Sequence, residues 1–90
     1  MPKRSSGLRA GVVRLRPGGI MDWHSTQQRE ELLIAMAGRV VLETHAVSGR
    51  KRCVTLRVGQ CAFLPRRTKH RVINRSTAAA RYIYVTAPAT

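Results

Sequence analysis

The chain has 90 residues, 43% of them hydrophobic, and carries 17 Lys and Arg against four Asp and Glu, a formal charge of +13. This length predicts one small domain with a thin core, and the hydrophobic fraction excludes an intrinsically disordered chain. No apolar run is long enough for a membrane-spanning helix, and the basic N-terminus lacks the apolar segment of a secretory signal. We therefore expect a cytoplasmic protein without a membrane partner.

Short extended segments follow one another along the chain, separated by turn residues at intervals of roughly ten positions. Pro17-Gly18-Gly19 closes the first segment, and Ser48-Gly49-Arg50 indicates a hairpin. The apolar stretch 31–38 is short and ends at a glycine, which favours a buried strand over a helix. The expected strands cover residues 8–16, 20–24, 31–38, 39–47, 51–58, 60–65, 70–74 and 80–88.

About eight short strands without a convincing helix predict an all-β domain, built as an antiparallel sandwich or barrel. We expect residues 7–90 to form this single domain and residues 1–6 to be a flexible basic arm. Cys53 and Cys61 lack the spacing of a metal site, and we expect two buried free thiols rather than a disulfide.

Two groups of residues, within 18–38 and 59–74, carry a pair of spaced motifs. The first group comprises Gly18, His24, Thr26, Glu31 and Gly38. The second comprises Gly59, Pro65, Arg67, His70 and Asn74. This pair of motifs resembles that of the cupin superfamily, with Thr26 in place of a second histidine and Arg67 in place of a glycine. The resemblance implies an antiparallel double-stranded β-helix, or jelly-roll barrel. Cupins include dioxygenases, sugar isomerases, epimerases, decarboxylases and plain binding domains, so the fold does not choose among these functions.

The alternation of side chains along strands indicates how the candidate metal ligands can meet inside such a barrel. If Glu31 points inward, Glu30 points to the opposite face. His24 ends the preceding strand, and His70 reaches the same place from a distant strand if the sheet curls. Two imidazoles and one carboxylate form a three-ligand site with open positions, as in non-haem iron and catalytic zinc centres.

We therefore predict a divalent transition metal bound by His24, Glu31 and His70; iron, manganese, zinc, nickel and copper all remain candidates. The alternative is a metal-free barrel in which the histidines only form hydrogen bonds, and Thr26, a poor metal ligand, favours it. Candidate substrate-binding residues are Thr26, Gln28 and Arg67.

Arg67 lies in a strongly basic turn beside His70. One interpretation is a solvated basic rim, and the other is a mouth that orients a carboxylate or phosphate near the metal. A glycine in this turn tolerates a positive φ, which costs a residue with a side chain roughly 1 kcal/mol or more. Either the turn has another shape here, or contacts hold the arginine in place.

Three functions follow from these observations. The first is a metal-binding cupin that binds or transforms a small anionic molecule, and the second is a metal-free ligand-binding or regulatory module. The third is nucleic-acid binding, which the scattered basic residues and scarce aromatic residues make the weakest of the three. The thin core and the apolar character of both faces of strand 31–38 predict a homodimer.

Overall fold

The computed structural model describes residues 7–89 of the chain. The expected arm, residues 1–6, and residue 90 lie outside the described part. The described residues contain eight strands and no helix, as the sequence predicts. The strands are β1 (Arg9–Leu15), β2 (Ile20–Ser25), β3 (Arg29–Ala37), β4 (Arg39–His45), β5 (Lys51–Arg57), β6 (Cys61–Leu64), β7 (Lys69–Ile73) and β8 (Ala80–Pro88).

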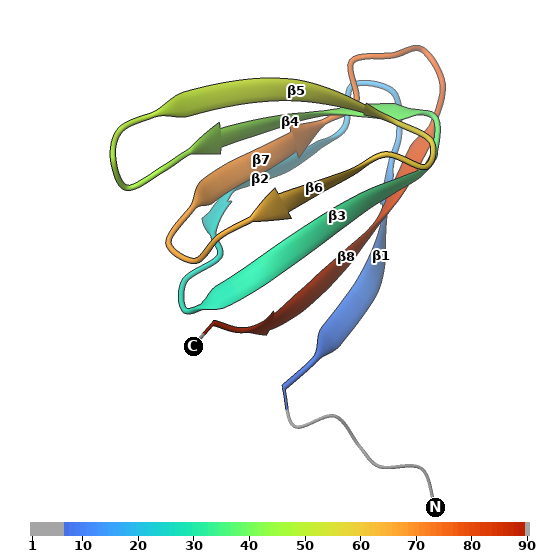
Figure 1. Ribbon diagram of the computed structural model, residues 1–90. Helices are drawn as coiled ribbons and strands as arrows, with labels where there is room; N and C mark the ends of the chain where they lie inside the picture. Colours follow the sequence, from blue (N-terminus) through green and yellow to red (C-terminus); the bar gives the residue numbers. More distant parts are fainter. Residues whose placement is uncertain (1–6, 90) are drawn as a thin grey trace, which may run out of the picture.

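The strands form two four-stranded antiparallel sheets, with the orders β1-β8-β3-β6 and β2-β7-β4-β5. The sheets stack against each other and close into a flattened barrel (Figure 1). Within them, strands that are distant in sequence lie side by side, such as β1 with β8 and β2 with β7. This arrangement confirms the predicted jelly-roll barrel, and it brings β2, β3 and β7 around one interior space.

The core lies between the two sheets and contains every second side chain of the strands. In β3, Leu33 and Ala35 are buried whereas Met36 is 40% exposed, which confirms the predicted alternation in this strand. The buried cluster comprises Leu15, Leu33, Ala35, Val40, Leu42, Leu56, Leu64, Val72, Ala80 and Tyr82.

Gly38 carries the chain from β3 in one sheet to β4 in the other. Its φ is +67°, a conformation that residues with a side chain rarely adopt, and a Cβ at this position would lie 2.6 Å from the carbonyl oxygen of Ala79. Both the backbone conformation and the available space therefore require glycine at this crossing.

The two cysteines are free, as expected, but the prediction that they are buried is wrong, because both are exposed. Cys53 is paired with Glu43 and Cys61 with Ile34 in their sheets. Both thiols belong to the set of alternate residues that faces away from the core. The alternation of apolar residues in β5 and β6 is too weak in the sequence to reveal this orientation.

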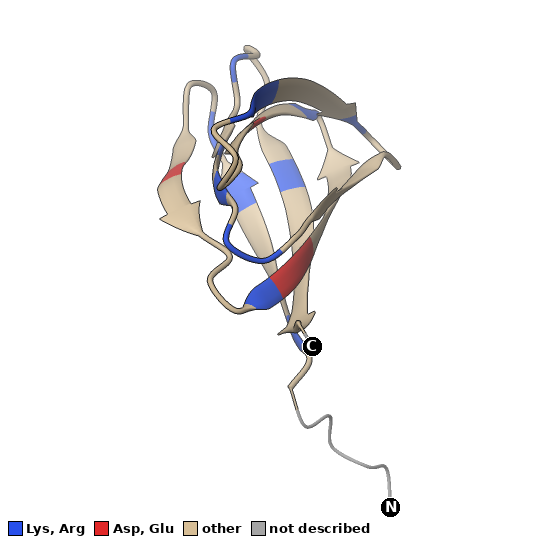
Figure 2. Ribbon diagram, turned by 60° about the vertical axis from the view of Figure 1, so that its left-hand side comes forward, with Lys and Arg blue, Asp and Glu red and all other residues tan. Residues whose placement is uncertain are grey.

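Lys and Arg positions are distributed over strands and turns of both sheets rather than along one strand (Figure 2). Such a distribution produces a general positive field around the molecule. Among the described residues, no helix is long and apolar enough to cross a membrane.

Candidate metal centre

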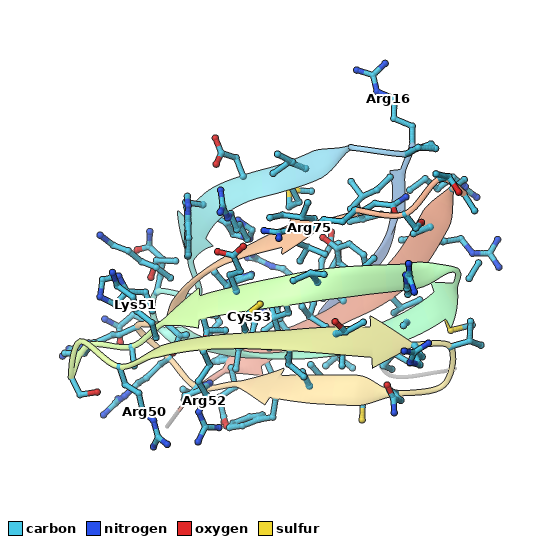
Figure 3. All side chains as sticks on the ribbon, turned by 90° about the horizontal axis from the view of Figure 1, so that it is seen from above. Arg16, Arg50, Lys51, Arg52, Cys53 and Arg75 are labelled. Carbon is cyan, nitrogen blue, oxygen red and sulfur yellow. The ribbon has the colours of Figure 1, made fainter. Side chains whose placement is uncertain are left out.

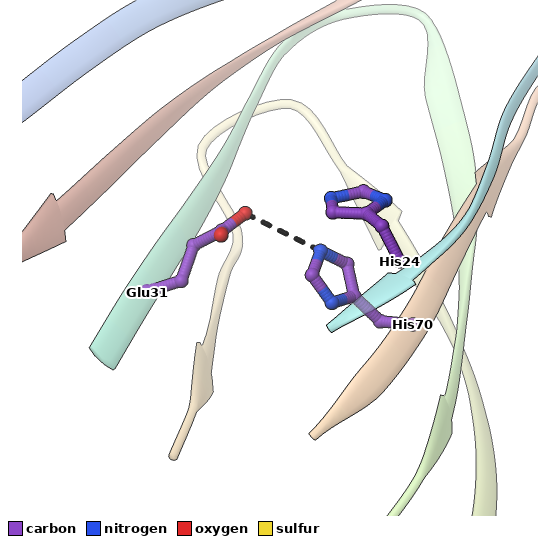
Figure 4. A group of neighbouring side chains, drawn as sticks. All are labelled: His24, Glu31 and His70. Atoms are coloured by element: carbon purple, nitrogen blue, oxygen red, sulfur yellow. Dashed lines mark ion pairs between the residues drawn. The ribbon is translucent and has the colours of Figure 1, made fainter. Parts of the chain in front are cut away.

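His24, Glu31 and His70 meet inside the barrel, from β2, β3 and β7 respectively (Figure 4). Their candidate ligand atoms all lie within 4.8 Å of one another. The Nε2 atom of His70 is 3.4 Å from the Oε2 atom of Glu31. The centroids of the two imidazole rings are 4.1 Å apart. The three residues predicted as metal ligands therefore form one cluster.

Strand pairing accounts for this convergence. His24 and His70 are direct partners in the antiparallel β2–β7 pair, after an irregularity in β2 between Met21 and His24. Glu31 belongs to the opposite sheet and faces inward near the start of β3. His70 is 1% exposed, Glu31 is partly buried, and His24 is exposed. The cluster thus has one buried wall and one side that a small molecule can reach.

The Nδ1 atoms of both histidines face backbone carbonyl groups. Nδ1 of His24 lies 2.8 Å from the backbone carbonyl oxygen of Asp22, and Nδ1 of His70 lies 3.4 Å from that of Thr68. Because a carbonyl oxygen only accepts hydrogen bonds, each Nδ1 is the donor, and in a neutral imidazole the lone pair is then on Nε2. Metal-binding histidines commonly have this backbone support.

The lone pair on Nε2 of His70 creates an electrostatic requirement. This atom and the carboxylate of Glu31 are both acceptors, and 3.4 Å separates them. Such a pair needs a positive charge between or beside its members, which either a metal ion or an additional proton supplies. The donor set, two imidazoles and a carboxylate, fits a divalent transition metal with open positions.

Thr26 is buried and ties together the β2–β3 and β6–β7 loops. Its hydroxyl donates a hydrogen bond to the Pro65 carbonyl at 2.8 Å and accepts one from the Thr68 backbone N–H at 3.0 Å. The residue at the position of the family's second histidine thus has a clear structural contact. A role for Thr26 in substrate binding stays a prediction.

Gln28 and Arg67 are both exposed in the loops beside the cluster. Arg67 has a φ of +57°, so the turn keeps the shape expected for glycine and was not remodelled. Its backbone N–H donates to the Gln27 carbonyl oxygen at 2.8 Å, and this loop-to-loop bond holds it there. The predicted substrate roles of Gln28 and Arg67 are not tested by these contacts.

A cavity of about 250 Å³ adjoins the cluster and includes His24 and Glu31 in its wall. The rest of this wall was not predicted from the sequence, although the alternation in residues 80–88 places three of its members on one face. Among residues 7–89, no Lys or Arg belongs to the wall, whose other members are Val13, Met21, Tyr82, Tyr84 and Thr86.

Tyr82 is a buried phenol in this wall. Burial raises the pKa of Tyr82 well above its usual value, and the nearby charge of Glu31 and the Tyr84 phenol raise it further. Tyr82 therefore stays neutral, and its hydroxyl remains a hydrogen-bond donor at physiological pH.

Comparison with known protein families shows which class of protein this fold and site define. The family model for the cupin domain matches residues 11–86. The chain therefore belongs to the cupin family, as its two motifs predict. A comparison with curated proteins gave no match.

Solved structures agree on the fold. An oxalate oxidase structure superposes with a TM-score of 0.86 at 19% identity, covering 91% of this chain and 42% of that one. Peruvianin-I, a cysteine peptidase from Thevetia peruviana latex, gives 0.85 at 19% identity and covers 91% and 51%. The Drosophila melanogaster CENP-C cupin domain gives 0.82 at 20% identity and covers 91% and 57%. At these identities the likeness concerns the fold alone, and this chain spans about half of each of those proteins.

Proposed function

We propose that this cupin domain binds a divalent transition metal through His24, Glu31 and His70, and that a small molecule binds beside the metal. The observation that carries the proposal is the convergence of the three side chains within 4.8 Å, in which Nε2 of His70 lies 3.4 Å from the Glu31 carboxylate. A bound metal would neutralise this contact and act as a Lewis acid toward the small molecule. One protein of similar fold, oxalate oxidase, has been solved in complex with glycolate, which is a small anion.

The adjoining cavity supports a small ligand with an anionic group. Its volume of about 250 Å³ suits a molecule of a few heavy atoms, and no Lys or Arg of the described part of the chain lines it. The metal would then be the positive charge that attracts the anion, while the hydroxyl groups of Tyr82, Tyr84 and Thr86 would orient the rest of the molecule.

The second candidate function is a metal-free ligand-binding or regulatory module. Two observations favour it: a proton alone satisfies the contact between His70 and Glu31, and Thr26 binds the loops where the family usually has a histidine ligand. The CENP-C cupin domain is described as bound to CAL1, which is an example of a cupin in a protein complex.

Metal analysis of the purified, untagged chain separates these two functions. We expect metal in the wild-type protein, and a sharp loss in His24→Ala and His70→Ala because each removes an imidazole ligand. His45→Ala is the matched control, since His45 ends β4 outside the cluster. Wild-type protein that takes up no metal even from a zinc-containing buffer would support the metal-free module instead.

We further propose that two copies of the chain form a homodimer through the outer face of the β1-β8-β3-β6 sheet. Val12 is 50% exposed on this face, and Phe63 is 59% exposed. The central positions of this face carry no charge, although the chain contains 17 Lys and Arg residues. These central residues are Ala10, Val12, Leu32, Ile34, Met36, Cys61, Phe63, Ile83, Val85 and Ala87.

The charges at the two ends of this face favour a second copy as the partner. Glu30 lies at one end, where it pairs with Ala87 in the sheet. Arg14 and Arg81 lie at the other end, directly opposite each other in the β1–β8 pair. A twofold axis in the plane of the face and perpendicular to the strands would place each Glu30 against the partner's arginine pair. Two sheets packed in this way bury the apolar centre between them.

A further inference from the structure

A second and larger cavity opens between β5 and β6, away from the metal cluster. These two strands are the edges of their sheets and are not hydrogen-bonded to each other. The turn at Gly59 and Gln60 draws them together at one end, where Gly59 and Gln60 bond to the backbone of Ala35. At the other end, toward Arg50 and Pro65, the sheets stay apart and leave a cavity of about 720 Å³. None of the three candidate metal ligands lines it.

The inner wall of this cavity is mainly apolar, with Thr44 and Thr68 as polar members. Leu42 and Leu64 form its deepest part and are both buried in the core, whereas Val54 is 44% exposed. Ala62 and Phe63 of β6 and Pro65 extend the apolar wall toward the opening. Exposed apolar surface of this kind in a concave site favours a ligand with an apolar body.

Two arginines stand at the opening. Arg50, just before β5, and Arg52, in β5, both line the cavity and project on the side of β6. The side chains of Lys51 and Cys53 lie on the opposite side of the strand (Figure 3). Among the described residues, neither guanidinium has an ion-pair or hydrogen-bond partner. The nearest acidic residue along the sheet, Glu43, is occupied by Arg71 and Arg75 on the outer face. The opening therefore has two uncompensated positive charges beside an apolar wall.

We propose that this cavity binds a small amphipathic carboxylic acid, with its apolar body against Leu42, Val54 and Leu64 and its carboxylate on Arg50 and Arg52. Guanidinium groups bind carboxylates through paired hydrogen bonds, and a cavity volume between about 300 and 1,000 Å³ is typical of small-molecule sites. An apolar wall next to the two arginines does not suit a nucleic-acid backbone, which needs charge and stacking surfaces instead. The site shares no residue with the metal cluster and does not depend on a bound metal.

Calorimetric titration of the full chain with octanoate, octan-1-ol and acetate tests the proposal. We expect octanoate to bind saturably, octan-1-ol to bind more weakly, and acetate not to bind, because the site needs both the apolar body and the charge. Arg50→Gln and Arg52→Gln should each weaken octanoate by about tenfold, the loss typical of one charge-assisted contact, and leave octan-1-ol unchanged. Arg57→Gln is the matched control, because Arg57 lies on the same strand and does not line the cavity.

Filling the cavity provides an independent test. Val54→Phe adds bulk at a half-exposed position, so circular dichroism should remain unchanged while the affinities for octanoate and octan-1-ol both fall. The titration is repeated with EDTA and with added zinc, and equal octanoate affinity in the two conditions is expected. Dependence on zinc would assign the octanoate to the metal cluster and overturn the proposal.

Three further results would also overturn it. Acetate that binds as well as octanoate would indicate general anion attraction by the charge of +13. Equal losses in Arg57→Gln and Arg52→Gln would have the same meaning. A single-stranded oligonucleotide that displaces octanoate, and that loses affinity in the same two arginine variants, would assign these arginines to nucleic acid.

Discussion

Arg67 has a left-handed backbone in a position where a glycine would be unstrained. Its φ of +57° costs roughly 1 kcal/mol for a residue with a side chain, and a glycine loses a similar free energy through its greater freedom in the unfolded chain. We expect Arg67→Gly to be neutral or stabilising by up to about 1 kcal/mol in urea unfolding. Arg66→Gly is the control in the same turn: Arg66 has no positive φ, and we expect a destabilisation of about 0.5–1 kcal/mol. A clear loss of stability in Arg67→Gly would mean that the guanidinium holds the turn.

Tyr82 links the candidate site to the pH dependence of stability. The pKa of this phenol is raised in the folded chain, first by burial and then by Glu31 and Tyr84. A raised folded pKa means that the folded state holds the proton more tightly, so this contribution is complete below the unfolded value of about 10 and is lost as the pH rises above it. We expect the unfolding free energy to fall above about pH 10 by up to ~1.4 kcal/mol per pH unit.

The variant Tyr82→Phe isolates this contribution. Urea unfolding in EDTA between neutral and strongly alkaline pH should give a flatter profile for Tyr82→Phe than for the wild-type chain. Tyr84→Phe is the comparison, since Tyr84 lies in the same wall but is only partly buried. Identical alkaline slopes in the wild type and in Tyr82→Phe would contradict the assignment.

Asn74 shows how a single residue organises several elements. This last residue of the second motif is fully buried after the end of β7. Its Nδ2 donates to the carbonyl oxygens of Leu15, Arg16 and Ala78, and its Oδ1 accepts from the backbone N–H and hydroxyl of Ser76. Asn74 thereby joins the end of β1 to the loop between β7 and β8.

We expect Asn74→Ala to destabilise the chain by about 3 kcal/mol in urea unfolding, because several buried backbone groups lose their partners at once. Arg75→Ala serves as the control in the same loop. Its side chain is 61% exposed and its ion pair with Glu43 is at the surface, so a loss below about 1 kcal/mol is expected. Similar losses in both variants would mean that the loop, rather than the amide, is responsible.

The strands themselves were predictable because turn residues and alternation are local properties of the sequence. The expected strand 31–38 corresponds to β3, and the inward orientation of Glu31 follows from parity within that strand. The meeting of His24, Glu31 and His70 was predictable from the two motifs. The roles of Asn74 and Thr26 were not, because they depend on carbonyl groups supplied by segments distant in the sequence. The cytoplasmic location stays a prediction.

The larger cavity illustrates the same division between local and long-range information. Alternation along residues 50–54 can place Arg50, Arg52 and Val54 on one face of a strand. The separation of β5 from β6 results from the order of strands in two sheets, which no local pattern contains. For this reason the sequence drew attention to Arg67 as an anion-binding residue, whereas the arginines that line the larger cavity are Arg50 and Arg52.

At the scale of the whole molecule, the proposed homodimer reconciles a strongly basic chain with an uncharged sheet face. The two cysteines provide natural reporters, because Cys61 lies on the proposed interface and Cys53 lies on the other sheet. We expect sedimentation and light scattering to give a dimer mass at moderate salt. Alkylation of Cys61 should slow as the protein concentration rises, while alkylation of Cys53 should keep a constant rate.

A charge in the apolar face should separate the subunits. Val12→Glu changes a residue that is 50% exposed, so the fold should tolerate it while the two introduced carboxylates are excluded from a buried interface. We expect this variant to be a folded monomer whose Cys61 reacts as fast as Cys53 at every concentration. Thr55→Glu adds the same charge to the outer face of the other sheet and should leave the dimer intact. A wild-type monomer mass, or dimers that dissociate with Thr55→Glu and persist with Val12→Glu, would place the contact elsewhere.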